Sequence, residues 1–464
     1  MKSADFLKKA MALSALCAIL LTGCGAKENS SGTGNASGNK DNSTVSSDKI
    51  EMPTADLSNN SKELHIFGWS SMEENETDGV AAEYFEKEYG VKITTTTSTH
   101  TEYWNDLAKM VAAGNSPDVV DLSYDKFYPI PLANDLLQPL DGLIDFSNPL
   151  WKDTEQLRED FRWKGKIYYP MVSEFLQCWV YYNKTMFKNY GLEEPWALYE
   201  KDEWTLDKMC ETASAFVTKN NRNEVTQWGL TIQNIEFMSI AGIQPWEIQH
   251  GEKVVNNLRD SKIAKVMNAM YGISAAGTGA ITRQDAIPVF KSGQCAMLMS
   301  QANVFLSADM DNMRGKGALG FAPLPKLDEN SNYATEVAID PGYGLIKGAK
   351  NTDLALLWIN YLKWFRYGEN FCVYIPAKEK TPAQERYNLK ARASSASYTD
   401  EEVAMIEKYI ASNPTKVYVT FRSIATAMGL KDTFKGMLSG STQWSAFLQE
   451  MYPTVDSKLN QYIK

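Results

Sequence analysis

The stretch Leu64-His65-Ile66-Phe67-Gly68-Trp69-Ser70-Ser71 decides how the rest of the chain is interpreted. Its first four residues alternate and predict a strand, and the apolar run stops at Gly68. Apolar residues then recur at helical spacing over Val80–Tyr89. A strand that ends just before a helix places Trp69-Ser70-Ser71 at the carboxyl edge of a sheet, where open α/β proteins bind ligands. The alternative is that Trp69 is a core residue at a strand end, because large aromatics are usually well buried.

The next segments continue the same alternation. A β-branched run over residues 91–97 predicts a strand, and a second helix is predicted over 103–111. A turn at Ser116-Pro117-Asp118 leads into a buried strand over 119–122. This β-α-β-α-β order predicts a mostly parallel sheet. Ser123 and Tyr124 follow its third strand and therefore join the same edge.

The amino terminus has the pattern of an export signal. Basic residues precede an apolar run over 10–21, which is too short to span a bilayer. Leu21-Thr22-Gly23-Cys24 resembles the cleavage box of bacterial lipoproteins, which implies removal of residues 1–23 and a lipid on Cys24. Residues 24–61 are rich in Ser, Asn and Gly and predict a flexible tether. This arrangement predicts a protein anchored by lipid at the outer face of the cytoplasmic membrane.

Length and composition limit the remaining classes. A chain of 464 residues exceeds one ordinary core, so two lobes are expected. The net charge of −10 without a basic face argues against nucleic-acid binding. Three scattered histidines and widely spaced cysteines show no metal motif, and no cofactor motif is present. We interpret Cys178, Cys210, Cys295 and Cys372 as small buried residues, with one disulfide left open in an exported protein.

Six segments, taken together and in order, resemble the extracellular solute-binding proteins of carbohydrate ABC importers, the maltose-binding-protein-like family. The resemblance implies an α/β fold of type II, periplasmic-binding-protein-like, with two lobes of mostly parallel sheets flanked by helices and a hinged cleft. It further implies a monomer without enzymatic activity that delivers a sugar or oligosaccharide to the transmembrane subunits of an ABC permease. The segments are MVAAGNSPDVVDLS (110–123), GKIYYPMVSEFLQCWVYYNKTMFKNYGLEEP (165–195), DEWTLDKMCETA (202–213), VFKSGQCAMLMSQANVF (289–305), LGFAPLP (319–325) and AIDPGYGLIKGAKN (338–351).

The family pattern also implies where the chain crosses between the lobes. We place the crossings near Leu176–Trp179, Ser300–Ala302 and Gly344–Ile346. Accordingly, the expected N-terminal lobe is 62–176 with 301–345, and the expected C-terminal lobe is 177–300 with 346–464. A hinge of a few residues would let the lobes close on a ligand.

Residues at strand ends and crossings are the candidates for ligand contact. Aromatic faces stack on sugar rings, and carboxylates, amides and hydroxyls satisfy the sugar hydroxyls. Each candidate also has a structural alternative: packing for the aromatics, a solvated strand position for Glu174, and a self-bonded Asp-Pro-Gly turn for Asp340. The predicted ligand-binding residues are Trp69, Ser70, Ser71, Ser123, Tyr124, Glu174, Trp246, Gln301, Asn303, Asp340, Gly342 and Tyr343.

Other functions remain open at this point. A polyamine would be held by carboxylates around aromatics, and Glu73-Glu74 lies close to Trp69. A peptide or a glycerol phosphodiester is a further possibility, although a phosphate favours Arg or Lys at strand ends. Arg162, Arg283 and Arg422 are the arginines to consider. A secreted glycosidase needs only two carboxylates, which composition cannot rule out.

Overall fold

The computed structural model describes residues 51–58, 61–74, 78–99, 101–122, 127–282, 284–366, 398–413 and 415–464. All of them belong to one compact unit, residues 50–464. The predicted signal, Cys24, most of the tether, Ser123, Tyr124, Arg283 and Cys372 lie outside the described residues. Within the described ranges, no helix combines the length and the apolar character needed to cross a membrane.

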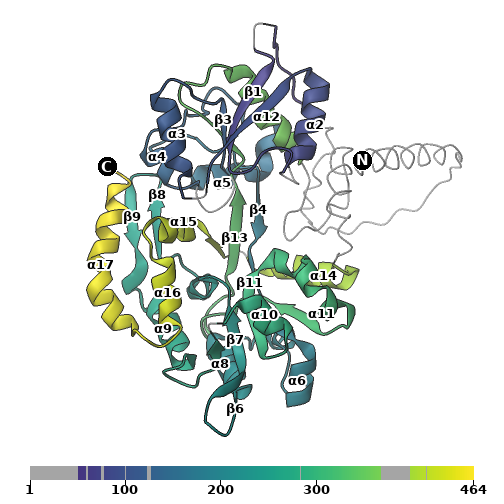
Figure 1. Ribbon diagram of the computed structural model, residues 1–464, viewed down its shortest axis with the longest axis vertical. Coiled ribbons are helices and arrows are strands. Elements are labelled where there is room, and N and C mark those ends of the chain that lie inside the picture. Colours follow the sequence, from purple (N-terminus) through teal and green to yellow (C-terminus); the bar gives the residue numbers. More distant parts are fainter. Residues whose placement is uncertain are drawn as a thin grey trace, which may run out of the picture. The chain divides into compact units, whose positions relative to one another are not determined.

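The first lobe is built on a four-stranded sheet in the order β14-β3-β1-β2. β1 pairs in parallel with both β2 and β3, as the β-α-β-α-β alternation predicts, and β14 runs antiparallel to β3 (Figure 1). The strands are β1 (Glu63–Gly68), β2 (Lys92–Thr97), β3 (Val119–Asp121) and β14 (Tyr343–Leu345).

An aromatic core joins the helices of this lobe. Phe85 lies with its ring centroid 5.1 Å from those of Trp358 and Tyr361, in edge-to-face contacts that favour close packing. The apolar residues of α12 (Thr352–Phe365) therefore belong to the core of this lobe. The helices are α2 (Asp78–Tyr89), α3 (Tyr103–Ala112), α4 (Ile130–Ala133), η1 (Pro149–Thr154), α5 (Glu155–Asp160) and α12 (Thr352–Phe365).

The second lobe is built on a larger sheet in the order β10-β7-β11-β5-β12, with β6 paired to β7. β7, β10 and β11 are parallel to one another, whereas β5 runs antiparallel to both β11 and β12. A separate hairpin is formed by β8 and β9. The strands are β5 (Cys178–Asn183), β6 (Thr218–Lys219), β7 (Val225–Ile232), β8 (Trp246–Gln249), β9 (Lys253–Asn256), β10 (Ile281–Thr282), β11 (Cys295–Gln301) and β12 (Leu319–Ala322).

Several helices of the second lobe begin at a capping side chain. The Thr205 hydroxyl accepts a hydrogen bond of 3.2 Å from the backbone N–H of Lys208 and caps α8. The helices are α6 (Lys184–Tyr190), α7 (Pro195–Glu200), α8 (Leu206–Ala215), η2 (Glu236–Ala241), η3 (Asn257–Arg259), α9 (Ser261–Ile273), α10 (Ala286–Lys291), η4 (Ala302–Leu306), η5 (Ala308–Met310), α11 (Asp311–Gly315), α14 (Asp400–Ser412), α15 (Thr420–Ala427), α16 (Lys431–Met437) and α17 (Trp444–Gln461).

A third, three-stranded sheet links the lobes. β13 (Thr335–Asp340) is its central strand, antiparallel to β4 (Ser173–Leu176) and parallel to β15 (Lys416–Tyr418). β4 and β13 run between the two larger sheets (Figure 1). The chain enters the second lobe between β4 and β5, where a crossing was expected. It returns to the first lobe between β13 and β14, across Pro341-Gly342.

Strand pairing corrects the predicted lobe boundaries. No crossing occurs at Ser300–Ala302, because β12 follows in the chain and still pairs with β5 of the second lobe. Gly344 and its neighbours are not a crossing either, because β14 already pairs with β3 of the first lobe. Residues 301–334 therefore belong with the second lobe, and 346–366 belong with the first.

The aromatic and β-branched residues of Ile167–Pro170 favour a strand, but none forms there. Ile167–Pro170 has no ladder partner along its length. Pro170 lacks an N–H to donate, and Met171 follows with a φ of 57°, a left-handed value incompatible with a continuing strand. The segment instead makes single contacts, such as the backbone N–H of Leu140 donating to the carbonyl of Ile167 at 2.7 Å.

Candidate ligand-binding site

The carboxyl edge of the first sheet presents an exposed aromatic ring. β1 ends at Gly68, and the Trp69 side chain that follows is 40% exposed, which is unusual for so large an apolar residue. Ser70 and Ser71 next to it are partly exposed. Trp69 therefore lies at the carboxyl edge of the sheet, as predicted from the sequence, and it is not a core residue.

Glycine and backbone contacts shape this edge. A Cβ on Gly68 would stand 3.1 Å from the carbonyl oxygen of Ser70, so the chain turns sharply there. The Gly68 carbonyl accepts a hydrogen bond of 3.1 Å from the backbone N–H of Ser98, which follows β2. The Ser71 carbonyl accepts at 3.1 Å from the N–H of Glu74 and closes the loop. Trp69 is therefore held by backbone contacts on both sides.

A buried tyrosine beneath the edge joins two strand ends. The Tyr103 hydroxyl donates to the Asp121 carbonyl at 2.7 Å and lies 3.3 Å from the Phe67 carbonyl. Burial raises the pKa of Tyr103 well above its ordinary value, so the hydroxyl stays protonated and able to donate. Its role is structural.

The carboxyl edge of the second sheet presents amides. Gln301 ends β11 and is partly exposed, and Asn303 in η4 is exposed. The buried Tyr181 hydroxyl lies 2.8 Å from the Gln301 carbonyl and 2.9 Å from the Ala302 carbonyl, and it accepts from the Phe305 N–H at 3.1 Å. This tyrosine fixes the turn that displays Gln301 and Asn303.

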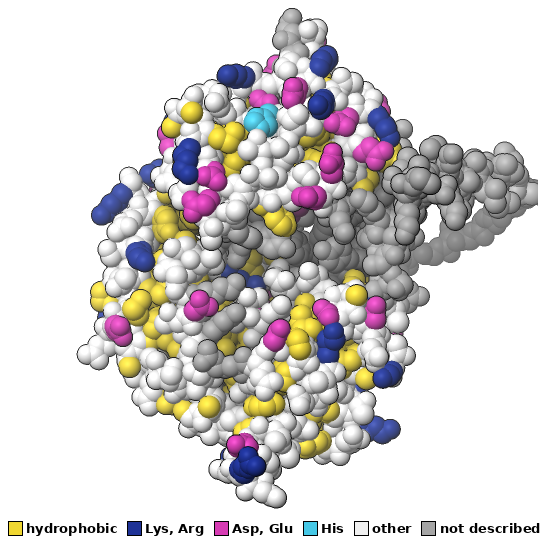
Figure 2. Space-filling model, in the orientation of Figure 1, with side chains coloured by type: hydrophobic (Ala, Val, Ile, Leu, Met, Phe, Trp, Pro, Cys, Tyr) yellow, Lys and Arg dark blue, Asp and Glu magenta, His cyan; other side chains and the backbone are white. Residues whose placement is uncertain are grey.

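Two further polar residues at this edge were missed from the sequence. Gln233 and Asn234 directly follow β7, which runs parallel to β11, and both are partly exposed. The Gln233 amide oxygen accepts a hydrogen bond from the Ser300 hydroxyl. The alternating run Thr226–Ile232 was the signal that would have predicted this strand end. Figure 2 shows acidic and basic side chains scattered over the face of both lobes that it presents.

Trp246 is not part of this surface. Its side chain is 0% exposed, its ring packs on Phe434, and its indole N–H donates to the Phe421 carbonyl at 3.1 Å. A ring without accessible area cannot stack on a ligand in this conformation. The prediction of Trp246 as a ligand-facing wall is therefore corrected to a core position.

The segment between β13 and β14 is also structural. The Asp340 carboxylate accepts from the Gly342 N–H at 2.9 Å and from the Arg366 guanidinium. Gly342 has a φ of 77°, and a Cβ there would lie 2.7 Å from Cγ2 of Val172. These contacts satisfy the polar groups of the Asp-Pro-Gly turn within the protein. Asp340 and Gly342 therefore have a structural role and are not part of the proposed ligand site.

Tyr343 belongs to the same buried network. It is almost wholly buried, and its hydroxyl donates to the Asp78 carboxylate at 2.8 Å. Arg366 pairs with both Asp78 and Asp340, so one guanidinium joins α2 to the crossing segment. Arg366 was not singled out from the sequence, because its pairing with Asp78 joins residues far apart in the chain. The prediction that Tyr343 faces a ligand is corrected accordingly.

Glu174 lies in the linking sheet. Its carboxylate forms an ion pair with Lys416 across β4 and β15, and both side chains are partly exposed. This pair ties the outer strands of the sheet on either side of β13. Glu174 therefore makes an ion pair within the sheet that links the lobes. Its contact with a ligand remains a prediction.

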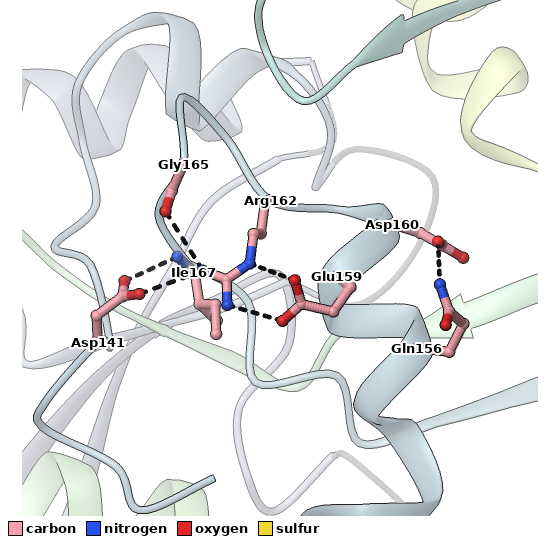
Figure 3. Close-up of polar contacts among 7 residues, drawn as sticks. All are labelled: Asp141, Gln156, Glu159, Asp160, Arg162, Gly165 and Ile167. Atoms are coloured by element: carbon pink, nitrogen blue, oxygen red, sulfur yellow. Dashed lines mark hydrogen bonds and ion pairs between the residues drawn. The ribbon is translucent and has the colours of Figure 1, made fainter.

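The arginines considered for a phosphate ligand are engaged elsewhere. Figure 3 shows Arg162 between Asp141 and Glu159, with Nε 2.6 Å from the Glu159 carboxylate and Nη1 3.4 Å from Asp141. The guanidinium lowers the pKa of the Glu159 carboxyl. Arg422 is buried and pairs with Glu336. These contacts argue against a phosphate site built on either guanidinium.

The described cysteines and acidic residues suggest no metal centre. Cys178, Cys210 and Cys295 are free thiols. Burial raises the pKa of Cys210 and of Cys295 to about 12, so both stay as thiols near neutral pH. No group of three or more His, Cys, Asp or Glu residues with metal-binding geometry occurs in the described part of the chain.

Comparison with known proteins identifies the family. The model of the bacterial extracellular solute-binding proteins matches residues 69–363, more than half of the chain. The chain belongs to this family. A comparison with curated protein sequences found no match.

Solved structures with a similar two-lobed α/β fold cover most of this chain. An ABC substrate-binding protein from Listeria monocytogenes in complex with cycloalternan is 18% identical, with a TM-score of 0.61 over 86% of this chain and 99% of that one. MalE from Bdellovibrio bacteriovorus bound to maltotriose is 17% identical, with a TM-score of 0.56 over 86% and 100%. A solute-binding protein from Thermotoga lettingae bound with α-D-tagatose is 16% identical, with a TM-score of 0.56 over 87% and 100%. The resemblance confirms the predicted type II binding-protein fold.

Proposed function

We propose that this solute-binding protein captures a sugar or oligosaccharide between its lobes and delivers it to the transmembrane subunits of an ABC permease. The observation that carries the proposal is the exposed Trp69 ring at the carboxyl edge of the first sheet. An indole face stacks on the apolar face of a sugar ring, and neighbouring hydroxyl and amide groups exchange hydrogen bonds with its rim.

The proposed contacts come from both lobes. Trp69-Ser70-Ser71 supplies the stacking surface and two hydroxyls, and Gln301 with Asn303 supplies amides from the carboxyl edge of the second sheet. Ser123 and Tyr124 remain proposed by their place in the sequence, after β3. The ligands named for the three solved structures are all sugars, which supports this class of ligand.

A polyamine is the second candidate, because Glu73 and Glu74 are exposed close to Trp69 in the chain. Carboxylates around an aromatic ring attract an ammonium group. A thermal-shift screen of the full chain with maltotriose, maltotetraose and spermidine separates the two, since a ligand raises the melting temperature of the state it binds. A shift with an oligosaccharide alone supports the proposal. A shift with spermidine alone contradicts it, and release of shorter sugars would indicate a glycosidase.

We further propose that the protein acts as a monomer held at the outer face of the cytoplasmic membrane by a lipid on Cys24. The lipoprotein-like segment Leu21-Thr22-Gly23-Cys24 and the polar tether after it support this. In a bacterial host, the wild type is expected in the membrane fraction and to be released by detergent. Cys24→Ala should appear in the soluble or secreted fraction. Equal partition of the two proteins would contradict the anchor.

A further inference from the structure

A second contact joins the lobes in addition to the linking sheet. The β8–β9 hairpin of the second lobe reaches the first lobe next to α4 (Figure 1). The turn of this hairpin meets a turn of the first lobe that spans residues 163–166. The Lys164 backbone N–H donates to the His250 carbonyl at 2.6 Å. The lobes are therefore joined tip to tip, by residues that belong to neither of the described crossings.

Both turns hold a non-glycine residue in a left-handed backbone conformation. In the first-lobe turn, Lys164 and Gly165 have φ values of 48° and 76°. In the hairpin turn, His250 and Gly251 have φ values of 53° and 69°. Two successive positive φ values are typical of tight type I′ turns. A lysine and a histidine in this conformation are strained, and such strain persists only where surrounding contacts hold the backbone in place.

Packing and a buried hydrogen bond reinforce the contact. A Cβ on Gly251 would stand 2.4 Å from the Trp163 ring, so the hairpin backbone lies directly against that ring and only glycine fits. Trp163 is buried and meets Tyr128 edge to face at 5.7 Å between ring centroids. The Tyr128 hydroxyl donates to the carbonyl of Ile248 in β8, and both residues are buried. Separating the two surfaces would leave this carbonyl without its donor.

Aromatic rings connect this contact to the linking sheet. Tyr128 packs edge to face on Phe161 at 5.6 Å, and Phe161 packs in the same way on Tyr418 of β15 at 5.5 Å. The boundary between the lobes is therefore apolar from the linking sheet to the hairpin. Domains move relative to each other by default, but a large apolar interface opposes their separation.

We propose that the β8–β9 hairpin and the 163–166 turn form a permanent second junction between the lobes, which we call the hairpin junction. Two junctions define a line, so the lobes rotate about the line between the hairpin junction and the linking sheet and do not part at the hairpin. The inference goes beyond the proposed function, because it concerns how the lobes move. Only the ligand arm of its test rests on sugar binding.

Hydrogen–deuterium exchange of the full chain, measured by mass spectrometry, tests the hairpin junction. In the wild type, the 163–166 turn should exchange slowly, because the Lys164 N–H is held by the other lobe. Gly251→Ala, whose Cβ collides with the Trp163 ring, should accelerate exchange of this turn by about 10-fold or more. Gly191→Ala is the matched control, because Gly191 also has a positive φ, 64°, and a Cβ there meets nothing within 4 Å.

A milder variant tests the junction without a steric collision. Tyr128→Phe removes only the hydroxyl that donates to Ile248, and it should accelerate exchange of the 163–166 turn by about 3- to 10-fold. Strand β7 of the second lobe, residues 225–232, is the internal reference. Its exchange should be unchanged in every variant, which distinguishes opening of the junction from a loss of global stability. Melting temperatures check that each protein is folded.

The outcomes decide between a permanent junction and a contact that opens. Slow exchange of the 163–166 turn that Gly251→Ala and Tyr128→Phe accelerate, and Gly191→Ala does not, supports the proposal. Equal exchange of this turn in the wild type and both junction variants overturns it.

Saturation with maltotriose provides the ligand arm. A permanent junction keeps exchange of the 163–166 turn as slow as in the free protein, whereas faster exchange with ligand shows that the lobes part at the hairpin and overturns the proposal. Failure of the proposed sugar function has a different signature, namely no thermal shift with any oligosaccharide. In that case the comparison of the ligand-free proteins still decides whether the junction exists.

Discussion

Two buried carboxylates share one guanidinium beside the linking sheet. Glu336 of β13 and Glu236 of η2 are fully or almost fully buried, and Arg422 of α15 pairs with Glu336 and lies 3.6 Å from Glu236. The Ser239 hydroxyl donates to Glu336, and the Asn234 N–H donates to Glu236 at 2.9 Å. One positive charge thus faces two acidic groups out of water, which favours keeping a proton on one of them.

The free energy of unfolding should therefore fall as the pH rises through the pKa of the protonated carboxyl. Burial raises the pKa of Glu336 from its ordinary 4.5 to about 7, opposed by Arg422 and assisted by Glu236. The folded state therefore holds a proton that the unfolded state releases between pH 4.5 and 7. This contribution is complete below pH 4.5 and is lost as pH rises through 7. Its size is on the order of 3 kcal/mol, because the two pKa values differ by about 2.5 units at 1.36 kcal/mol for each unit.

Urea denaturation between pH 5 and 8 measures this contribution. The free energy of unfolding of the wild type should fall over this range by on the order of 1–3 kcal/mol more than that of Glu336→Gln, whose amide does not titrate. Glu211→Gln, at an exposed glutamate of α8, is the control and should follow the wild type. If wild type and Glu336→Gln lose the same stability with rising pH, the carboxyl does not titrate in this window and the reasoning is refuted.

Two further predictions concern positions reassigned to the core. Trp246→Ala should lower the free energy of unfolding by about 3–5 kcal/mol in urea denaturation, because it leaves a large cavity; a loss under 1 kcal/mol would show that the ring is not packed as described. Gly342→Ala should cost about 1–3 kcal/mol through its left-handed φ and the contact with Val172. Gly272→Ala in α9, where a Cβ meets nothing within 4 Å, should be neutral or stabilising, and equal effects of the two glycine changes would contradict the turn argument.

Local sequence patterns predicted the elements but not the long-range pairing. Apolar spacing located α2, α3, β1, β2 and β3, because periodicity depends on neighbouring residues alone. The predicted lobe crossing at Ser300–Ala302 was wrong. Only the pairing of β12 with β5 shows that the chain stays in the second lobe. No local signal near residue 302 carries that information.

The candidate site divides in the same way. Trp69 was predicted because it directly follows a strand, and a strand end places it at a sheet edge. Gln301 and Asn303 were predicted from a lobe crossing that does not occur, and they lie at and just after the end of β11. Trp246 and Tyr343 were wrongly predicted to face a ligand. The local sequence around an aromatic residue in a strand is the same whether its ring is buried or faces a cleft. Their burial depends on Phe421 and Asp78, which lie 175 and 265 residues away along the chain.

Trp69 is proposed to form a wall of the sugar site. Isothermal titration calorimetry of the full chain with the oligosaccharide giving the largest thermal shift tests this most directly. The wild type should bind with one-to-one stoichiometry, and Trp69→Ala should lose about 1–3 kcal/mol, a roughly 5- to 150-fold rise in Kd. Leu143→Ala, at another exposed apolar residue of the first lobe, should bind like the wild type. Equal affinity of Trp69→Ala and the wild type, or no binding of any oligosaccharide, would contradict a sugar site walled by Trp69.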